Sequence, residues 1–204
     1  MTISTLISSV LQLVLFSAVP FIFWLIWGRK KGSFFEWIGL SKPMLKNKPK
    51  FYIFFIATFI LYAVLGMITV RFFTGDTELA SSEFYGLGFS GLAAVAIYAF
   101  IKTGLSEEIV FRGLIGKRLC AKIGFHTGNM IQAFLFGLLH GVMLFPSAGI
   151  FNAAVVTLMT GSIGWVMGYM NEKLAGGSIL PSWIIHGLSN FYSSALVLFN
   201  ITLL

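Results

Sequence analysis

Polar side chains that could hydrolyse an amide lie inside hydrophobic parts of this sequence. Glu107 and Glu108 interrupt one apolar segment, His140 lies in a second, and a third holds His186 and Asn190. Translocon-based scales put each ionised side chain at about +2.5 to +3.5 kcal/mol at the centre of a bilayer. Residues that are retained at this cost, without an evident partner, are functional by default.

These residue types fit one chemistry. A glutamate in apolar surroundings is suited to act as a general base near neutral pH, and a histidine beside it can help to deprotonate a water molecule. A second histidine with an asparagine can donate hydrogen bonds to a developing oxyanion. The set therefore predicts amide hydrolysis by an activated water, for which no serine or cysteine nucleophile is needed.

The local spacing separates the roles of the two glutamates. Glu108 and Arg112 are four residues apart, with the acid first, which is the favoured order for an ion pair on a helix. We interpret this pair as mainly structural. Glu107 is rotated by about 100° from Glu108 and has no basic partner at helical spacing, so we expect it to be functional. His186 and Asn190, also four residues apart, face one cavity.

Composition places these residues in a membrane protein. Of the 204 residues, 57% are hydrophobic and only 10% are charged, whereas a soluble domain has about 25% charged residues. Most of the exterior must therefore face lipid, which predicts an all-α, polytopic transmembrane helix bundle. The net charge of +7 resides in loops between spans, so it sets topology and does not indicate nucleic-acid binding. Cys120 is the single cysteine, which excludes an internal disulfide and a cysteine-based metal cluster.

About six spans are expected, because a helical span needs roughly 20 mostly apolar residues. They cover about Ile3–Trp27, Phe51–Val70, a third segment from Gly86, Phe125–Leu144, Ile150–Met170 and a sixth from Ile179. The first lacks a basic n-region and is too long for a cleavable signal, so we expect it to be retained. We expect one membrane domain over residues 1–204, with a two-span part at 1–85 and a catalytic core at 86–204. Glycine spacing in the later spans indicates close helix packing.

Charge asymmetry predicts the orientation. The loop Gly28–Lys50 holds seven basic residues and one acid, and 11 of the 14 basic residues fall on the same side as this loop. By the positive-inside rule that side is cytoplasmic. The loop Arg71–Tyr85, which carries Asp76, Glu78 and Glu83, is then outside, as are the turn at 145–147 and the C-terminus.

The polar residues of three spans fall at similar depths. At 1.5 Å per residue, Glu107 lies about 15 Å from the cytoplasmic edge and His140 roughly 16 to 21 Å from it. His186 lies about 10 Å from that edge, and Asn190 about 6 Å deeper. Either histidine alone is as readily an interhelical hydrogen-bonding residue as a catalytic one. The shared depth favours a common site between the later helices.

Three motifs at these residues resemble the CPBP family of CAAX proteases and bacteriocin-processing (Abi) enzymes. The first is Glu-Glu-x-x-x-Arg at residues 107–112, and the second is Phe-x-x-x-His at residues 136–140. The third is His-x-x-x-Asn at residues 186–190. They occur in the family's order, on separate hydrophobic segments, over about Gly86 to Tyr192. Individually these motifs are weak, but jointly in a membrane protein they are specific.

The resemblance implies an intramembrane endopeptidase whose site opens to the cytoplasm. It implies that Glu107 activates water with help from His140, and that His186 and Asn190 stabilise the oxyanion. Structural support would come from Glu108, Arg112 and Phe136. We favour a glutamate-dependent reaction without a metal, since the chain lacks a His-Glu-x-x-His motif. A zinc site made of Glu107, His140 and His186 remains the alternative, because two histidines and one glutamate are a known catalytic zinc set.

The chain departs from the eight-span eukaryotic CAAX endopeptidase in having six predicted spans and short loops. A prenylated CAAX substrate is therefore not implied, and we expect a peptide or a membrane protein in a bacterial cytoplasmic membrane. One rival hypothesis is a non-catalytic, peptide-binding membrane protein of bacteriocin immunity. Another is a small transporter with a glutamate and histidine proton relay, although no internal repeat supports it.

Overall fold

The computed structural model describes residues 1–73 and 80–201, and within these residues every regular element is helical. The predicted all-α class is therefore confirmed. The α-helices are α1 (Thr2–Phe23), α2 (Phe34–Ile38), α3 (Lys48–Phe73), α4 (Leu92–Ile97), α5 (Ser106–Glu108), α6 (Lys117–Ile123), α7 (Phe125–Tyr169) and α8 (Leu180–Leu198). Wider π-helical turns occupy Trp24–Gly28, Tyr98–Leu105, Ile109–Gly116 and Met170–Leu174, and 3₁₀ turns occupy Ala80–Phe84 and Gly88–Gly91.

Among the described residues, four helical stretches are long and apolar enough to cross a membrane. They are Thr2–Gly28, Lys48–Phe73, Gly88–Ile123 and Phe125–Leu174. Few residues of Lys48–Phe73 are fully buried, and the helix packs one face, which includes Phe55, Phe59 and Tyr62, against the core.

The longest stretch consists of two antiparallel arms. Gly149 interrupts α7 with φ 80° and ψ 172°, a conformation that favours glycine because a Cβ would be strained there. The arms, 125–148 and 150–174, correspond to the predicted fourth and fifth spans. The sixth was expected from Ile179, where α8 lies, but α8 is not among the four stretches, so this span stays a prediction. The turn was expected at residues 145–147, but helix continues through Pro146 and ends where glycine permits the reversal.

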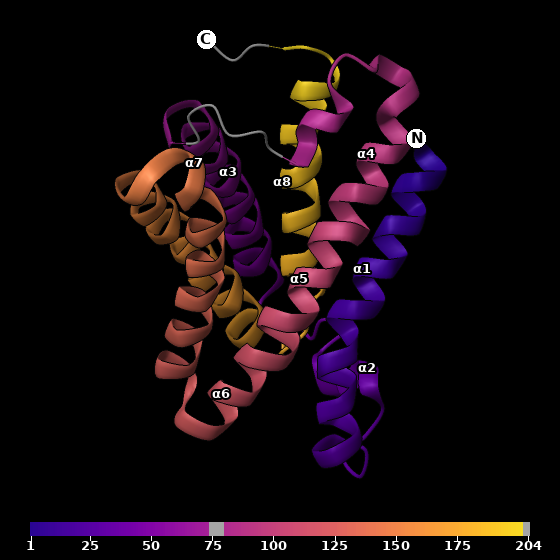
Figure 1. Cartoon of the computed structure of the whole chain (residues 1–204). Helices are drawn as coiled ribbons and strands as arrows, with labels where there is room; N and C mark the ends of the chain where they lie inside the picture. Colours follow the sequence, from indigo (N-terminus) through magenta and orange to yellow (C-terminus); the bar gives the residue numbers. More distant parts are fainter. Residues whose placement is uncertain (74–79, 202–204) are drawn as a thin grey trace.

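The segments run up and down the molecule and bring the basic loops to one end. In Figure 1 both termini lie at the upper end, whereas α2, α6 and the start of α8 lie at the lower end. The connections at this lower end carry the basic residues that the sequence assigns to the cytoplasmic side. Asp76 and Glu78, expected outside, are not among the described residues. Which end faces the cytoplasm stays a prediction.

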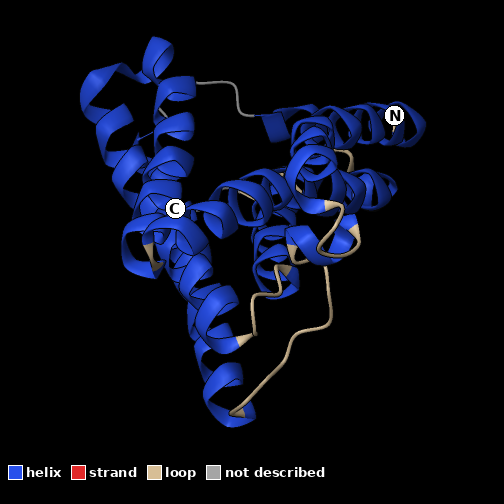
Figure 2. Cartoon of the chain, turned by 90° about the horizontal axis from the view of Figure 1, so that it is seen from below, coloured by secondary structure: helices blue, strands red, loops and turns tan. Residues whose placement is uncertain are grey.

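Close backbone packing holds the two arms of α7 together. A Cβ added at Gly137 would lie 2.8 Å from the Gly161 nitrogen and 3.0 Å from its Cα, which real Cβ contacts do not allow. This confirms that these glycines serve helix packing. Figure 1 shows α3 beside the arms of α7, on the side of the molecule away from α1, and the view from below shows helices as the regular elements of the described residues (Figure 2). The α8 helix packs against α3, α4 and Tyr98–Leu105, so it occupies the interior of the bundle.

Candidate active site

The two glutamates lie on a short α-helical step between two π-helical turns. Ser106–Glu108 is α-helical, with π-helix before it at Tyr98–Leu105 and after it at Ile109–Gly116. Such widened turns inside helices are frequent at functional sites. Glycines let α8 approach this segment: a Cβ at Gly104 would lie 3.5 Å from the backbone nitrogen of Gly187, and a Cβ at Gly187 would clash with the Phe100 ring.

Glu107 faces both histidines. Its Oε2 lies 3.9 Å from Nε2 of His140 and 3.8 Å from Nε2 of His186. The side chain of Glu107 is 15% exposed, that of His140 is 31% exposed and that of His186 only 2%. The structure thus brings these three side chains together from separate helical segments, and His140 is the most exposed of them.

The Nδ1 atom of each histidine has a hydrogen-bond partner, and the type of partner determines which ring nitrogen carries the proton. His140 Nδ1 is 2.8 Å from the Phe136 carbonyl, and His186 Nδ1 is 3.0 Å from Glu108 Oε1. Both partners are acceptors, so each Nδ1 must donate. In neutral rings the two Nε2 lone pairs then point toward Glu107 Oε2, which is itself buried without a hydrogen-bond partner among the described residues. Three acceptors converge on one point, and only a proton donor or a cation satisfies them there.

Glu108 is the structural centre of the site. It is fully buried, and its Oε1 lies 3.0 Å from both Arg112 Nη1 and His186 Nδ1. Its Oε2 accepts a hydrogen bond of 2.5 Å from the Ser182 hydroxyl. The expected pairing of Glu108 with Arg112 is therefore present, and the same carboxylate also orients His186, which ties Ser106–Gly116 to α8.

Two further residues belong to this network and were not predicted from the sequence, Ser182 and Asn171. The Asn171 amide donates to the Ser182 hydroxyl at 2.7 Å, while its oxygen accepts from the Ser182 backbone at 3.3 Å. The spacing of Ser182, four residues before His186, could have revealed that it shares the face of His186 and Asn190. Asn171 follows a span in the sequence, and no spacing indicates its contact with α8.

Phe136 supports the site with its backbone and its ring. Its carbonyl holds His140, and its ring centroid lies 4.0 Å below the Arg112 guanidinium carbon in a cation–π contact. The ring also lies 4.7 Å from the His140 ring and 6.0 Å from the His186 ring, centroid to centroid. The ring centroid of Tyr62, in α3, lies 5.9 Å from that of His186, so a helix that carries none of the three motifs also borders the site.

Asn190 binds the neighbouring helix. Its side-chain nitrogen donates to Thr103 Oγ1 at 2.9 Å, and the Thr103 hydroxyl lies within 3.2 Å of the Ala99 carbonyl. Asn190 lies one turn from His186 on α8, as its spacing predicts, and Thr103 fixes its orientation.

The converging atoms also resemble the donors of a zinc site in type. Two imidazole nitrogens and a carboxylate oxygen are a known catalytic set, but tetrahedral ligands at about 2.0 to 2.2 Å from zinc lie closer together than 3.8 and 3.9 Å. Among the described residues, no group of three His, Cys, Asp or Glu side chains is arranged closely enough to hold a metal ion. The donor types fit zinc, and the side chains would have to draw together to bind it.

The fold and the site define a polytopic membrane protein with a buried glutamate and histidine centre. A model of the family described as type II CAAX prenyl endopeptidase, Rce1-like, matches residues 89–192, which is 104 of the 204 residues. The chain therefore belongs to this family of CAAX-type intramembrane endopeptidases. No curated protein and no solved structure matches the chain significantly.

Proposed function

We propose that this protein is an intramembrane endopeptidase that cleaves peptide or membrane-protein substrates with a water molecule activated by Glu107. One observation carries the proposal. The Nε2 atoms of His140 and His186 both face the buried Glu107 Oε2, which has no hydrogen-bond partner among the described residues, and the His140 side chain is 31% exposed. A water molecule there donates to acceptors that otherwise face one another.

The reaction follows from these positions. Glu107 takes a proton from the water while its oxygen attacks the scissile carbonyl carbon, and His140 orients the same water. The carbonyl becomes a tetrahedral oxyanion, which accepts a hydrogen bond from the Asn190 amide. The proton then passes from Glu107 to the leaving nitrogen as the C–N bond breaks, and the peptide is released as a carboxylic acid and an amine.

Glu108 and Arg112 orient the site without touching the substrate. Glu108 keeps His186 with its Nδ1 protonated, and Arg112 offsets the buried negative charge. Since basic residues gather at one end, we also propose that this end faces the cytoplasm of a bacterial cell membrane and that the substrate enters there. The bilayer is the only other partner that the proposal needs.

The experiment compares cleavage of a quenched fluorescent peptide library by the detergent-purified protein and by Glu107→Gln, which keeps the shape of the side chain. We expect cleavage by the wild type and a loss of about 10² to 10⁴-fold in the variant. Glu36→Gln, which changes an exposed acid outside the site, is the matched control and should cleave normally. Full activity in a folded Glu107→Gln protein would falsify the proposal.

A chelator separates the metal-free reaction from the zinc alternative in the same assay. Unchanged cleavage after zinc chelation supports water activation by Glu107 alone. Loss of activity that zinc restores would assign Glu107, His140 and His186 to the metal. If no substrate in the library is cut, protection of cells from a bacteriocin by both wild type and Glu107→Gln would favour the non-catalytic immunity hypothesis.

A further inference from the structure

An open cleft of about 410 Å³ lies at the lower end of the molecule, between α6 and the Met170–Leu174 turn that follows α7. Lys117, Arg118 and Lys173 line it with a single acid, Glu172. Lys117 pairs with Glu172 at 3.4 Å, and the Lys173 ammonium lies 4.4 Å from the centroid of the Phe125 ring. The cleft therefore carries net positive charge.

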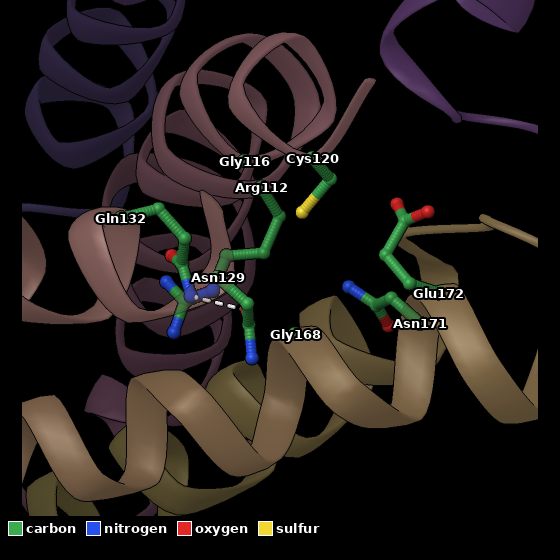
Figure 3. A pocket seen from close by; sticks show the side chains of 8 residues that line it. All are labelled: Arg112, Gly116, Cys120, Asn129, Gln132, Gly168, Asn171 and Glu172. Atoms are coloured by element: carbon green, nitrogen blue, oxygen red, sulfur yellow. Dashed lines mark hydrogen bonds between the residues drawn. The ribbon is translucent and has the colours of Figure 1, made fainter. Parts of the chain in front are cut away.

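A second, smaller pocket lies next to this cleft, and most of the side chains that line it are polar. The two spaces share Cys120 and Glu172 in their walls, and the inner one reaches Arg112 and Gln132. Figure 3 shows the Cys120 thiol pointing into the space between Arg112 and Asn171. The inner pocket leaves about 10 Å³ for the centre of a water-sized sphere, which is room for about one water molecule.

Two buried side chains at this pocket have polar atoms without a hydrogen-bond partner among the described residues. The three guanidinium nitrogens of Arg112 make no hydrogen bond to the described residues, although Nη1 contacts Glu108 as an ion pair. Gln132 is 1% exposed, and its Oε1 is also without a partner among them. The orientation of this amide is fixed, because its nitrogen donates to Asn129 Oδ1 at 2.9 Å and to the Gly164 carbonyl at 3.0 Å.

We propose that the cleft and the pocket form one hydrated passage, which binds a water molecule between the Arg112 guanidinium and Gln132 Oε1. A water molecule matches both sides, because it accepts from the guanidinium and donates to the amide oxygen. Buried waters typically satisfy polar groups in this way. The pocket is too small for a larger ligand, and the facing cation disfavours a metal ion.

The passage ends at Arg112, the ion-pair partner of Glu108. Its consequence is that this buried ion pair is in exchange with bulk water although it lies within an apolar bundle. The inference concerns access and binding, so it goes beyond the proposed peptidase activity and does not depend on it.

Cys120, the single cysteine, lines both the cleft and the pocket, so its reactivity reports on access to the point where the two meet. The experiment measures the rate at which the folded protein, in an uncharged detergent, reacts with methanethiosulfonates of similar size but opposite charge. Each rate is divided by that of the same reagent with a free thiol. We expect Cys120 to react, and the anionic reagent to be favoured by on the order of tenfold, because the cleft is cationic.

Two variants of similar chemistry sharpen the test. Lys173→Gln removes a charge from the cleft and should reduce the anionic preference by about threefold, whereas Lys122→Gln changes an exposed lysine outside the lining and should leave it unchanged. A Cys120 that reacts only after denaturation, or with no charge preference, would overturn the passage. Because labelling needs no cleavage, its failure is distinct from failure of the proposed function.

The bound water is tested by a high-resolution structure of the wild type and of Gln132→Met, which keeps the length of the side chain without an acceptor. We expect solvent density within hydrogen-bonding distance of both Arg112 and Gln132 in the wild type, and its loss in the variant. An empty pocket in the wild type would overturn this part of the inference.

Discussion

The Glu108 carboxylate holds the His186 ring at 3.0 Å, and it does so from a neighbouring helical segment 78 positions earlier in the chain. Through this contact the buried ion pair of Glu108 and Arg112 also orients the His186 ring. Arg112 balances the charge of Glu108, Glu108 fixes the proton on His186 Nδ1, and the opposite ring nitrogen is thereby directed at Glu107. The two adjacent glutamates therefore have different roles, because Glu108 orients the His186 ring and Glu107 faces the two histidine Nε2 atoms.

Glu108→Gln should destabilise the protein strongly. The substitution keeps the volume but leaves the Arg112 guanidinium buried without a counter-charge, and breaking such a pair costs about 3–5 kcal/mol. The loss is measured as the free energy of unfolding in detergent. Glu172→Gln breaks the partly exposed pair with Lys117 and should cost less than about 1 kcal/mol. Equal stability of the two variants would contradict the central role of Glu108.

Ser182→Ala should lower kcat with little effect on KM. The hydroxyl donates to Glu108 Oε2, and its removal leaves a buried carboxylate oxygen unsatisfied, which costs about 1–3 kcal/mol and loosens His186. Steady-state kinetics on a cleaved peptide provide the measurement. Ser182→Thr keeps the donor and should restore much of kcat. Ser162→Ala, at an exposed serine of α7, should behave like the wild type, and a KM effect alone would argue against positioning.

Much of the fold could be predicted from the sequence because lipid imposes strong constraints. Apolar length and charge asymmetry gave the spans and their common basic end, and glycine spacing indicated the close pairing of the α7 arms. The position of the turn at Gly149 could not be derived in the same way. Both Pro146 and Gly149 disfavour continued helix, and only the backbone conformation shows which one ends it.

The site was predictable where helical periodicity relates its members. The pair Glu108 and Arg112 follows from their spacing, and the convergence of Glu107 with the histidines follows from comparable depth. The contacts of Asn171 with Ser182 and of Asn190 with Thr103 depend on how two helices are rotated against each other. One sequence does not specify that rotation, since many apolar faces of similar character can pack together.

The basic end of the bundle should face the cytoplasm. Lys46→Cys and Ser82→Cys, each in a Cys120→Ser background, place thiols on exposed residues of connections at opposite ends. A membrane-impermeant maleimide should label Ser82→Cys in intact cells and Lys46→Cys only after the membrane is opened. Labelling both after lysis controls for reactivity. The reverse pattern in intact cells would contradict the proposed orientation and the cytoplasmic entry of substrate.

Thr103 and Asn190 should act as one unit in catalysis. If the Asn190 amide stabilises the oxyanion, Asn190→Ala should reduce kcat by about 10² to 10³-fold, in line with the loss of one such donor. Thr103→Val removes the hydroxyl that accepts from Asn190 Nδ2 but keeps the side-chain shape, so it should cause a smaller loss of kcat. Thr103→Ser retains the hydroxyl and should remain close to the wild type.

The double variant Thr103→Val with Asn190→Ala provides the decisive comparison. Once the amide is absent, the hydroxyl has nothing left to orient, so the double variant should be no slower than Asn190→Ala alone. Losses that simply multiply would show that Thr103 contributes independently of Asn190. An Asn190→Ala protein with wild-type kcat would instead reduce this contact to helix packing.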